Sequence, residues 1–214
     1  MLKRLFLCRH GESEYNAKGI IQGHIDTYLT PKGIVQARLA GEYLKNFNIQ
    51  KIYTSDLRRA YQTATIIGDI LGIEPLVDKR IREMNFGQWE GRFYDEIFIS
   101  NKDEWEKWLK NPVACPLPSQ EEFHIFEERI KDFLNEIKKQ KEERILVVGH
   151  GGSIQRIICI ETGIGLENIW ALRHTNTGIS LLEYDNIHTH AVLKFFNYDY
   201  HLENLKSKIK KGIM

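Results

Sequence analysis

The chain has 214 residues, of which 42% are hydrophobic and 28% are charged, as is usual for one soluble globular domain. Its formal net charge of +1 gives no reason to expect nucleic acid or an acidic membrane as a partner. The three cysteines lack metal-ligand spacing, and no apolar run is long enough for a signal peptide or a membrane span. We therefore expect a single cytoplasmic domain over residues 1–214.

A buried strand and a polar loop open the chain. Residues 2–8 are mostly apolar, and a loop rich in Gly, Asn, Asp and Thr follows to about residue 30. Thr30 and Pro31 then form a typical helix start, in which a capping hydroxyl precedes proline at the first helical position. Small and apolar residues at helical spacing up to Leu44 predict the buried face of that helix.

A second strand and helix follow the same pattern. We expect a short strand over residues 52–54 and then a helix that Ser55 caps and Gly72 ends. A third strand is expected over residues 75–77. Residues 84–118 carry several tryptophans and prolines without a regular period, and we expect them to form an irregular segment that covers the substrate.

The second half of the chain contains the clearest core strand. A long helix is predicted over residues 119–140, before the near-continuous apolar run of residues 144–148. Strands over residues 178–184 and 191–196 are expected to pair antiparallel, and their apolar edge could serve a homodimer, although nothing in the sequence requires one. The basic tail over residues 206–211 is expected to be a solvated terminus.

The alternation of strands and helices predicts an α/β fold, a three-layer α/β/α sandwich with a mostly parallel central sheet. Ligands of such sheets bind beyond the carboxyl ends of the strands. Because His10, Ser55 and His150 each follow a predicted strand, we expect them to converge on one rim of the sheet.

Arg9 and His10 stand where the first strand ends, just before the flexible Gly11. A guanidinium group binds phosphate oxygens in pairs, and a neutral imidazole is a nucleophile. This pair therefore indicates chemistry on a phosphate group, with His10 as the attacking residue.

Two adjacent arginines lie at the predicted start of the second helix, where a purely structural sequence would favour acidic residues. We interpret Arg58 as a solvated surface residue. Arg59 precedes the small Ala60, and we expect it to face a phosphate group together with the positive end of the helix.

His150 ends the core strand and precedes Gly151 and Gly152. Taken alone, it suits a turn histidine as well as a phosphate donor whose neighbouring glycines let the backbone come close. A second strand-end histidine in the same sheet favours the functional interpretation.

The general acid has two candidates near the aromatic stretch. Glu83 lies among Met84, Phe86 and Trp89, which would desolvate its carboxyl group as suits a proton donor. Glu90 is the competing candidate, and the residues alone do not separate the two.

These pieces together resemble the histidine phosphatase superfamily, the cofactor-dependent phosphoglycerate mutase-like proteins. The matching segments cover nearly the whole chain in the order of the family: residues 9–12, 22–23, 55–60, 62–64, 83–91 and 149–152. The resemblance implies that His10 becomes a phosphohistidine and that Glu83, rather than Glu90, donates the proton. It also implies a phosphate pocket of Arg9, Arg59 and His150, with Asn16, Gln22, Gly23 and Gly151 as further substrate-binding positions.

The charge of that pocket makes a metal ion unnecessary. Phosphoryl transfer depends mostly on positioning and on charge stabilisation, which two arginines and a histidine can supply. Positive charge nearby also lowers the pKa of His10 and keeps its imidazole neutral. We therefore expect activity on a small phosphate ester without a metal or a cofactor.

The resemblance favours hydrolysis over mutase chemistry. The resembling mutases carry a distinctly longer segment between the catalytic glutamate and the second histidine, and a shorter cover leaves the phosphohistidine open to water. Residues 82–90 and 169–173 look most like the branch of α-ribazole phosphate phosphatases and broad-specificity phosphatases, so α-ribazole phosphate is a candidate substrate.

Three alternatives stay open. The first is a cofactor-dependent phosphoglycerate mutase, and the second is a phosphoserine phosphatase, although some of those carry histidine where this chain has Phe86. The third is a protein that only binds phosphorylated ligands, which should have lost His10, Arg59 or Glu83.

Substrate choice is expected to depend on residues 93–118 and 173–176. Arg173 could hold a carboxylate of the substrate or pair with a neighbouring acid, and the aromatic rings could stack on a base or simply cover the pocket.

Overall fold

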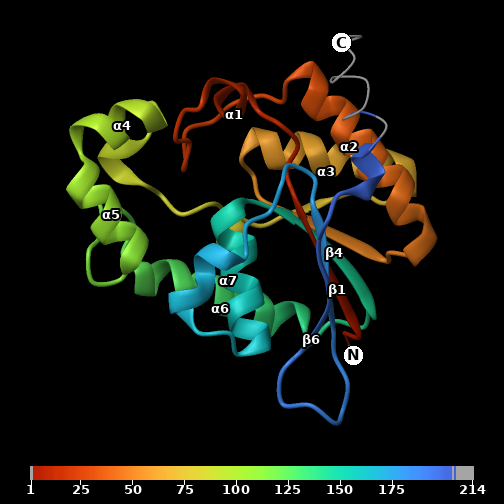
Figure 1. The fold of residues 1–214 in the computed structure, drawn as a ribbon. Coiled ribbons are helices and arrows are strands. Elements are labelled where there is room, and N and C mark those ends of the chain that lie inside the picture. The colour runs from red at the N-terminus through yellow and green to blue at the C-terminus, as the bar shows by residue number, and fades with distance from the viewer. Residues whose placement is uncertain (1, 204, 206–214) are drawn as a thin grey trace.

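A six-stranded sheet forms the centre of the computed structural model, which describes residues 2–203 and 205 (Figure 1). The strand order is β3-β2-β4-β1-β5-β6. The strands are β1 (Arg4–Arg9), β2 (Lys51–Thr54), β3 (Leu76–Val77), β4 (Arg144–Gly149), β5 (Ile179–Glu183) and β6 (Val192–Tyr198). The first four are parallel to one another, and β5 is antiparallel to both β1 and β6. The predicted mostly parallel sheet and its antiparallel C-terminal pair are confirmed.

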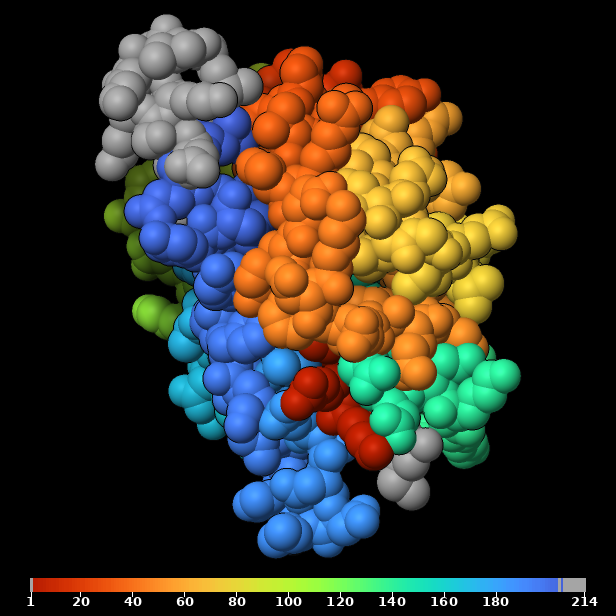
Figure 2. Space-filling model, turned by 90° about the vertical axis from the view of Figure 1, so that its right-hand side faces the viewer, coloured from red at the N-terminus to blue at the C-terminus, as the bar shows by residue number. Residues whose placement is uncertain are grey.

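Helices cover both faces of this sheet, because successive side chains of a strand point to opposite sides. Leu5 and Leu7 of β1 pack in a core with α6 (Phe123–Ile137) and α7 (Gly151–Thr162). Phe6 and Cys8 pack in a second core with α2 (Pro31–Leu44) and α3 (Arg58–Leu71). Figure 2 looks onto α2, which lies in orange between the yellow residues of α3 and the blue residues of the C-terminal strand. The three-layer arrangement agrees with the predicted fold class.

The helix starts show which local signals hold. Thr30 caps α2 as predicted, since its hydroxyl accepts a hydrogen bond from the amide of Gly33 at 3.0 Å. Ser55 does not cap α3, which begins only at Arg58. The amide of Arg58 instead donates to the carboxylate of Asp26 at 2.7 Å. The predicted cap was wrong because a residue from a distant loop takes that role.

Residues 84–118 are more regular than the sequence suggested. They contain a short 3₁₀ turn and two helices, α4 (Tyr94–Ser100) and α5 (Lys102–Lys110), which form an arm at the left of Figure 1. Trp89, Trp108 and Leu117 belong to a small core of their own within this arm. The helical period was missed because Trp108 is the one buried residue of α5, among mostly charged neighbours.

The remaining elements complete the description. A short helix, α1 (Glu14–Lys18), follows β1, and α6 is shorter at both ends than the predicted range of 119–140. The predicted basic terminus over residues 206–211 lies outside the described residues. Within the described part of the chain, no helix combines the length and the apolar character needed to cross a bilayer.

Candidate active site

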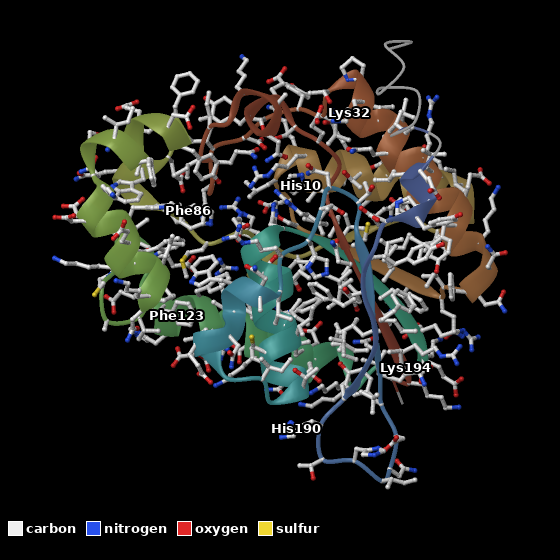
Figure 3. All side chains as sticks on the ribbon, in the orientation of Figure 1. His10, Lys32, Phe86, Phe123, His190 and Lys194 are labelled. Carbon is white, nitrogen blue, oxygen red and sulfur yellow. The ribbon has the colours of Figure 1, made fainter. Side chains whose placement is uncertain are left out.

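Two histidines meet where two parallel strands end. Arg9 of β1 lies beside Gly149 of β4, and the amide of His10 donates to the carbonyl of Gly149 at 2.9 Å. The imidazole rings of His10 and His150 consequently face each other with their centroids 5.2 Å apart. Ser55 follows the neighbouring strand β2 at the same edge, and its amide donates to the carbonyl of Val148. Figure 3 shows His10 at this end of the sheet.

The surroundings of His10 fix its tautomer. Its Nδ1 lies 2.7 Å from the carbonyl oxygen of Gly11, and because a carbonyl can only accept, Nδ1 carries the proton. Burial lowers the pKa of His10 well below its usual value, and the charges of Arg59 and Arg9 lower it further. The ring is therefore neutral at physiological pH, with an unprotonated Nε2 that can attack an electrophile.

Arg59 is buried near this ring, and the loop that contains Gly23 and Ile25 holds its guanidinium group. Two of its guanidinium nitrogens donate to the carbonyls of Gly23 at 2.7 Å and Ile25 at 3.0 Å. Its Nε is buried and has no partner. Burial lowers the pKa of Arg59 to about 10, so the side chain stays cationic. Arg58 points outward to an exposed ion pair with Asp26, in agreement with its assignment to the surface.

Gly23, predicted to bind substrate, supports Arg59 through its carbonyl. Its φ of +51° belongs to the left-handed region, and an added Cβ would meet the Glu90 carboxylate at 1.8 Å. Only glycine fits this turn without displacing the neighbouring glutamate. The contact of Gly23 with a substrate stays a prediction.

Arg9 and His150 add three more buried nitrogens without partners. One Arg9 amino group donates to the carbonyl of His174 at 2.6 Å, while its Nε makes no hydrogen bond. Both ring nitrogens of His150 are also buried without a partner. In the described part of the chain, no carboxylate forms an ion pair with Arg9 or Arg59. Buried donors left without a partner are costly, so this cluster suits a bound anion.

The helix α7 begins at the same place. Gly151 lines the cavity in front of the histidines, and the amide of Gly152 donates to the carboxylate of Glu83 at 3.0 Å. A helix N-terminus carries partial positive charge and attracts anions. The two glycines thus bring the positive end of α7 to the site, whereas the sequence had predicted only a close approach of their backbone.

The structure separates the two glutamates. Glu83 is nearly buried, accepts from the amides of Met84 and Gly152, and lines the cavity with Arg9. Both carboxylate oxygens of Glu90 accept hydrogen bonds from backbone amides, those of His24, Ile25 and Phe86. These bonds connect the loop around residue 24 to the loop around residue 86. Glu83 therefore lines the cavity, whereas Glu90 holds the surrounding backbone, and the role of Glu83 as proton donor stays a prediction.

Asn16 and Gln22 lie in one polar network near His10. Asn176 donates to the carbonyl of His10 at 3.0 Å and to Oδ1 of Asn16 at 3.1 Å. The amide oxygen of Gln22 accepts from the hydroxyls of Ser13 and Thr27, both at 2.8 Å. The predicted contacts of Asn16 and Gln22 with phosphate stay predictions.

No supporting role was predicted from the sequence for two residues near His10. Asn176 lies in the predicted specificity segment, but no motif indicated its bond to the backbone of His10. Thr63 accepts from the amide of Gly11 at 3.0 Å and donates to the carbonyl of Arg59 at 2.7 Å. It thereby links the histidine loop to the helix that carries Arg59.

A cavity of about 460 Å³ opens beside Arg9 and Gly151, the chain neighbours of the two histidines. Arg9, Glu83 and Gly151 line it on the side of the histidines, and aromatic residues of the α4–α5 arm line it on the other side. Figure 3 shows Phe86 between that arm and His10. The exposed Arg173 also lines this cavity, as the predicted role in substrate choice requires.

Comparisons with known proteins agree with this geometry. The family model of the histidine phosphatase superfamily (branch 1) matches residues 5–197. A Hydrogenobacter thermophilus protein named "Putative phosphoserine phosphatase 2" is 49% identical over 84% of this chain and 88% of its own length. The adenosylcobalamin/alpha-ribazole phosphatase of Escherichia coli is 29% identical over 79% of this chain and 84% of its own.

Solved structures show the same fold. A mycobacterial glucosyl-3-phosphoglycerate phosphatase in complex with VO3 superposes with a TM-score of 0.83 at 26% identity. The superposition covers 91% of this chain and 99% of the mycobacterial one.

Proposed function

This chain belongs to the histidine phosphatase superfamily and is a phosphatase, and we propose that it hydrolyses small phosphate monoesters through a phosphohistidine at His10. The single observation that supports this mechanism best is the set of unpartnered buried nitrogens around the histidine pair. Nε of Arg9, Nε of Arg59 and the ring nitrogens of His150 have no hydrogen-bond partner in the described protein. A phosphate group at Nε2 of His10 would supply the oxygen acceptors that these groups lack.

In the first step, Nε2 of His10 attacks phosphorus, and the bond between phosphorus and the ester oxygen breaks. The leaving alcohol takes a proton from the carboxyl group of Glu83, which becomes a carboxylate. The guanidinium groups of Arg9 and Arg59 stabilise the charge that develops on the equatorial phosphate oxygens. The carbonyl of Gly11 accepts from the Nδ1 proton and keeps the ring oriented through the step.

In the second step, the carboxylate of Glu83 removes a proton from a water molecule that attacks the phosphohistidine. The bond between phosphorus and Nε2 breaks, inorganic phosphate leaves, and both His10 and Glu83 return to their starting protonation states. The amides of Met84 and Gly152 hold the carboxylate in place for both proton transfers. No step requires a metal ion or a cofactor.

Hydrolysis is favoured over transfer back to a second alcohol. The cavity is bordered by the exposed side chains of Tyr94 and Arg173, which leaves water a route to the phosphohistidine. Phosphoglycerate mutase chemistry is the second candidate, because a relative named "Probable phosphoglycerate mutase GpmB" from Enterobacter sp. is 33% identical over 85% of this chain.

The first substrates to test come from the names of the relatives. The Hydrogenobacter thermophilus protein is named for phosphoserine, and the Escherichia coli protein for alpha-ribazole. Cytoplasmic location and a homodimer stay predictions of the sequence. The burial of the free thiols of Cys8 and Cys159 is compatible with a reducing compartment.

The test is phosphate release from phenyl phosphate, phosphoserine and α-ribazole phosphate in excess EDTA. We expect the parent protein to release phosphate and His10→Ala to lose the activity. His188→Ala is the matched control, because His188 is an exposed histidine that pairs with Asp185 on the hairpin between β5 and β6. Equal activity in His10→Ala and the parent, or activity that EDTA removes and Zn²⁺ restores, would contradict the proposal.

A further inference from the structure

The cavity in front of His10 is mostly aromatic beyond its phosphate end. The rings of Phe86, Tyr94, Trp105, Trp108 and Trp170 all line it. They support one another: Trp105 and Trp108 stack with centroids 5.4 Å apart, and Trp108 lies 4.8 Å from Trp170. A continuous wall of rings is complementary to a flat or apolar group. An alcohol as small and polar as serine would leave most of this wall uncovered.

Two polar groups within the wall have no partner in the described protein. Gln155 is only 5% exposed and lines the cavity one turn beyond Gly151 on α7, and its side-chain amide forms no hydrogen bond there. The indole nitrogen of Trp170 is also buried without a partner. The amide of Gln155 is therefore available to hydrogen-bond a polar group of the bound alcohol, because this side chain lines the cavity and has no other partner among the described residues.

A cation without a counter-ion completes this part of the cavity. Arg173 lines it, and in the part of the chain that the structure describes no carboxylate forms an ion pair with this residue. Arg129, an arginine of α6, is by contrast paired with Glu121 at 2.7 Å. A guanidinium without an ion-pair partner at the mouth of this cavity is a good partner for a carboxylate, because it offers two parallel N–H donors.

The cavity offers a positive group on the substrate no free carboxylate to bind. Glu83 is the one carboxylate among the described residues that line it, and two backbone amides hold that side chain for proton transfer. An ammonium group on the substrate would therefore enter a cavity that already holds Arg9 and Arg173. The charges favour a substrate with an additional negative group and disfavour one with a positive group.

We propose that the substrate is the phosphate monoester of an apolar, ring-sized alcohol that bears a carboxylate and no ammonium group. The carboxylate binds Arg173 and Gln155 while the ring covers the tryptophans. This proposal rests on the phosphatase function proposed above and names the class of its substrate. It differs from the phosphoserine that the name of the Hydrogenobacter thermophilus relative would suggest.

Five matched compounds test the proposal: benzyl phosphate, its meta and para carboxy derivatives, and its meta and para aminomethyl derivatives. The measured quantity is kcat/KM for phosphate release. We expect the better carboxy isomer to exceed benzyl phosphate by about 10- to 100-fold, as one charge-assisted contact allows, and the aminomethyl compounds to fall below it. In Arg173→Met, carboxybenzyl phosphate should lose its advantage in kcat/KM over benzyl phosphate. In Gln155→Leu, the ratio of these two kcat/KM values should be reduced.

Arg38→Met is the control, because Arg38 is an exposed arginine on α2 that does not line the cavity. This variant should keep the ratio of the parent. Equal kcat/KM values for all five compounds, or an unchanged ratio in Arg173→Met, would overturn the carboxylate site while leaving the phosphatase function intact. Failure of the parent to hydrolyse any of the compounds would instead count against the phosphatase function itself.

Discussion

Gly152→Ala should damage the general acid without touching the histidines. In the folded protein, a Cβ at this position would lie 2.3 Å from Oε1 of Glu83, whereas real Cβ contacts are essentially never under 3.0 Å. The carboxylate must therefore retreat, and it loses the alignment that the amide of Gly152 gives it at 3.0 Å. His10, Arg9 and Arg59 keep their own hydrogen bonds, which involve other residues.

The size of the effect follows from what the carboxyl group contributes. General acid catalysis typically contributes about 10²- to 10⁴-fold, and a displacement of roughly 1 Å can cost about 10²-fold. We expect the rate of phosphoryl transfer from an alkyl phosphate to fall about 10²-fold in Gly152→Ala. Transfer from p-nitrophenyl phosphate should fall far less, because its leaving group departs without a proton.

The assay is a single-turnover experiment with enzyme in excess, which isolates the transfer to His10 from the later hydrolysis. Glu83→Gln serves as the reference and should show the same dependence on the leaving group. Circular dichroism and the melting temperature establish that Gly152→Ala is folded. Equal losses with both esters, or full activity of Gly152→Ala with the alkyl ester, would refute the role given to Glu83.

Three further predictions concern the cationic pocket. Because burial, Arg59 and Arg9 lower the pKa of His10, its neutral form persists as the pH falls. The value of kcat/KM should therefore start to decline only well below pH 6.5, the ordinary pKa of a histidine, and a decline centred there would contradict this assignment. As the pH falls below 6.5, His10 is protonated in the unfolded chain before it is protonated in the folded protein. The free energy of unfolding should therefore decrease over this range, and chemical denaturation at several pH values can measure the decrease. Arg59→Lys should lower kcat/KM about 10²-fold, because an ammonium group cannot bind the carbonyls of Gly23 and Ile25 and still present a donor to phosphate. Arg58→Lys at the exposed neighbouring position is its control, and equal losses in the two variants would refute the distinction between them.

Local signals predicted the fold well where the relevant contacts are local. The hydroxyl of Thr30 and the ring of Pro31 fix a helix start within one turn, and Gly72 ends α3 with a φ of +69°. Ser55 failed as a cap because the amide of Arg58 is satisfied by Asp26, a residue 32 positions away. A signal of that kind exists only after the loop has folded against the helix.

The candidate site was predictable to the extent that its residues follow strands. Arg9, His10 and His150 come together because β1 and β4 are parallel neighbours, and strand order carries that information. The choice between Glu83 and Glu90 depends on which backbone amides each carboxylate reaches, and nothing in the local sequence encodes those contacts. Aromatic rings of residues 93–118 were expected to cover the pocket, but the helix α5 that carries Trp105 and Trp108 was not predicted, because its sequence is otherwise mostly charged.

The most direct test of the account is to trap the phosphoenzyme. The protein is mixed with phenyl [³²P]phosphate, quenched in alkali on the millisecond scale and digested, and the labelled peptide is analysed for the position of the phosphoryl group. The account predicts label on Nε2 of His10 that forms and decays fast enough to account for turnover. Turnover without any labelled protein, or label on another residue such as His150, would contradict it.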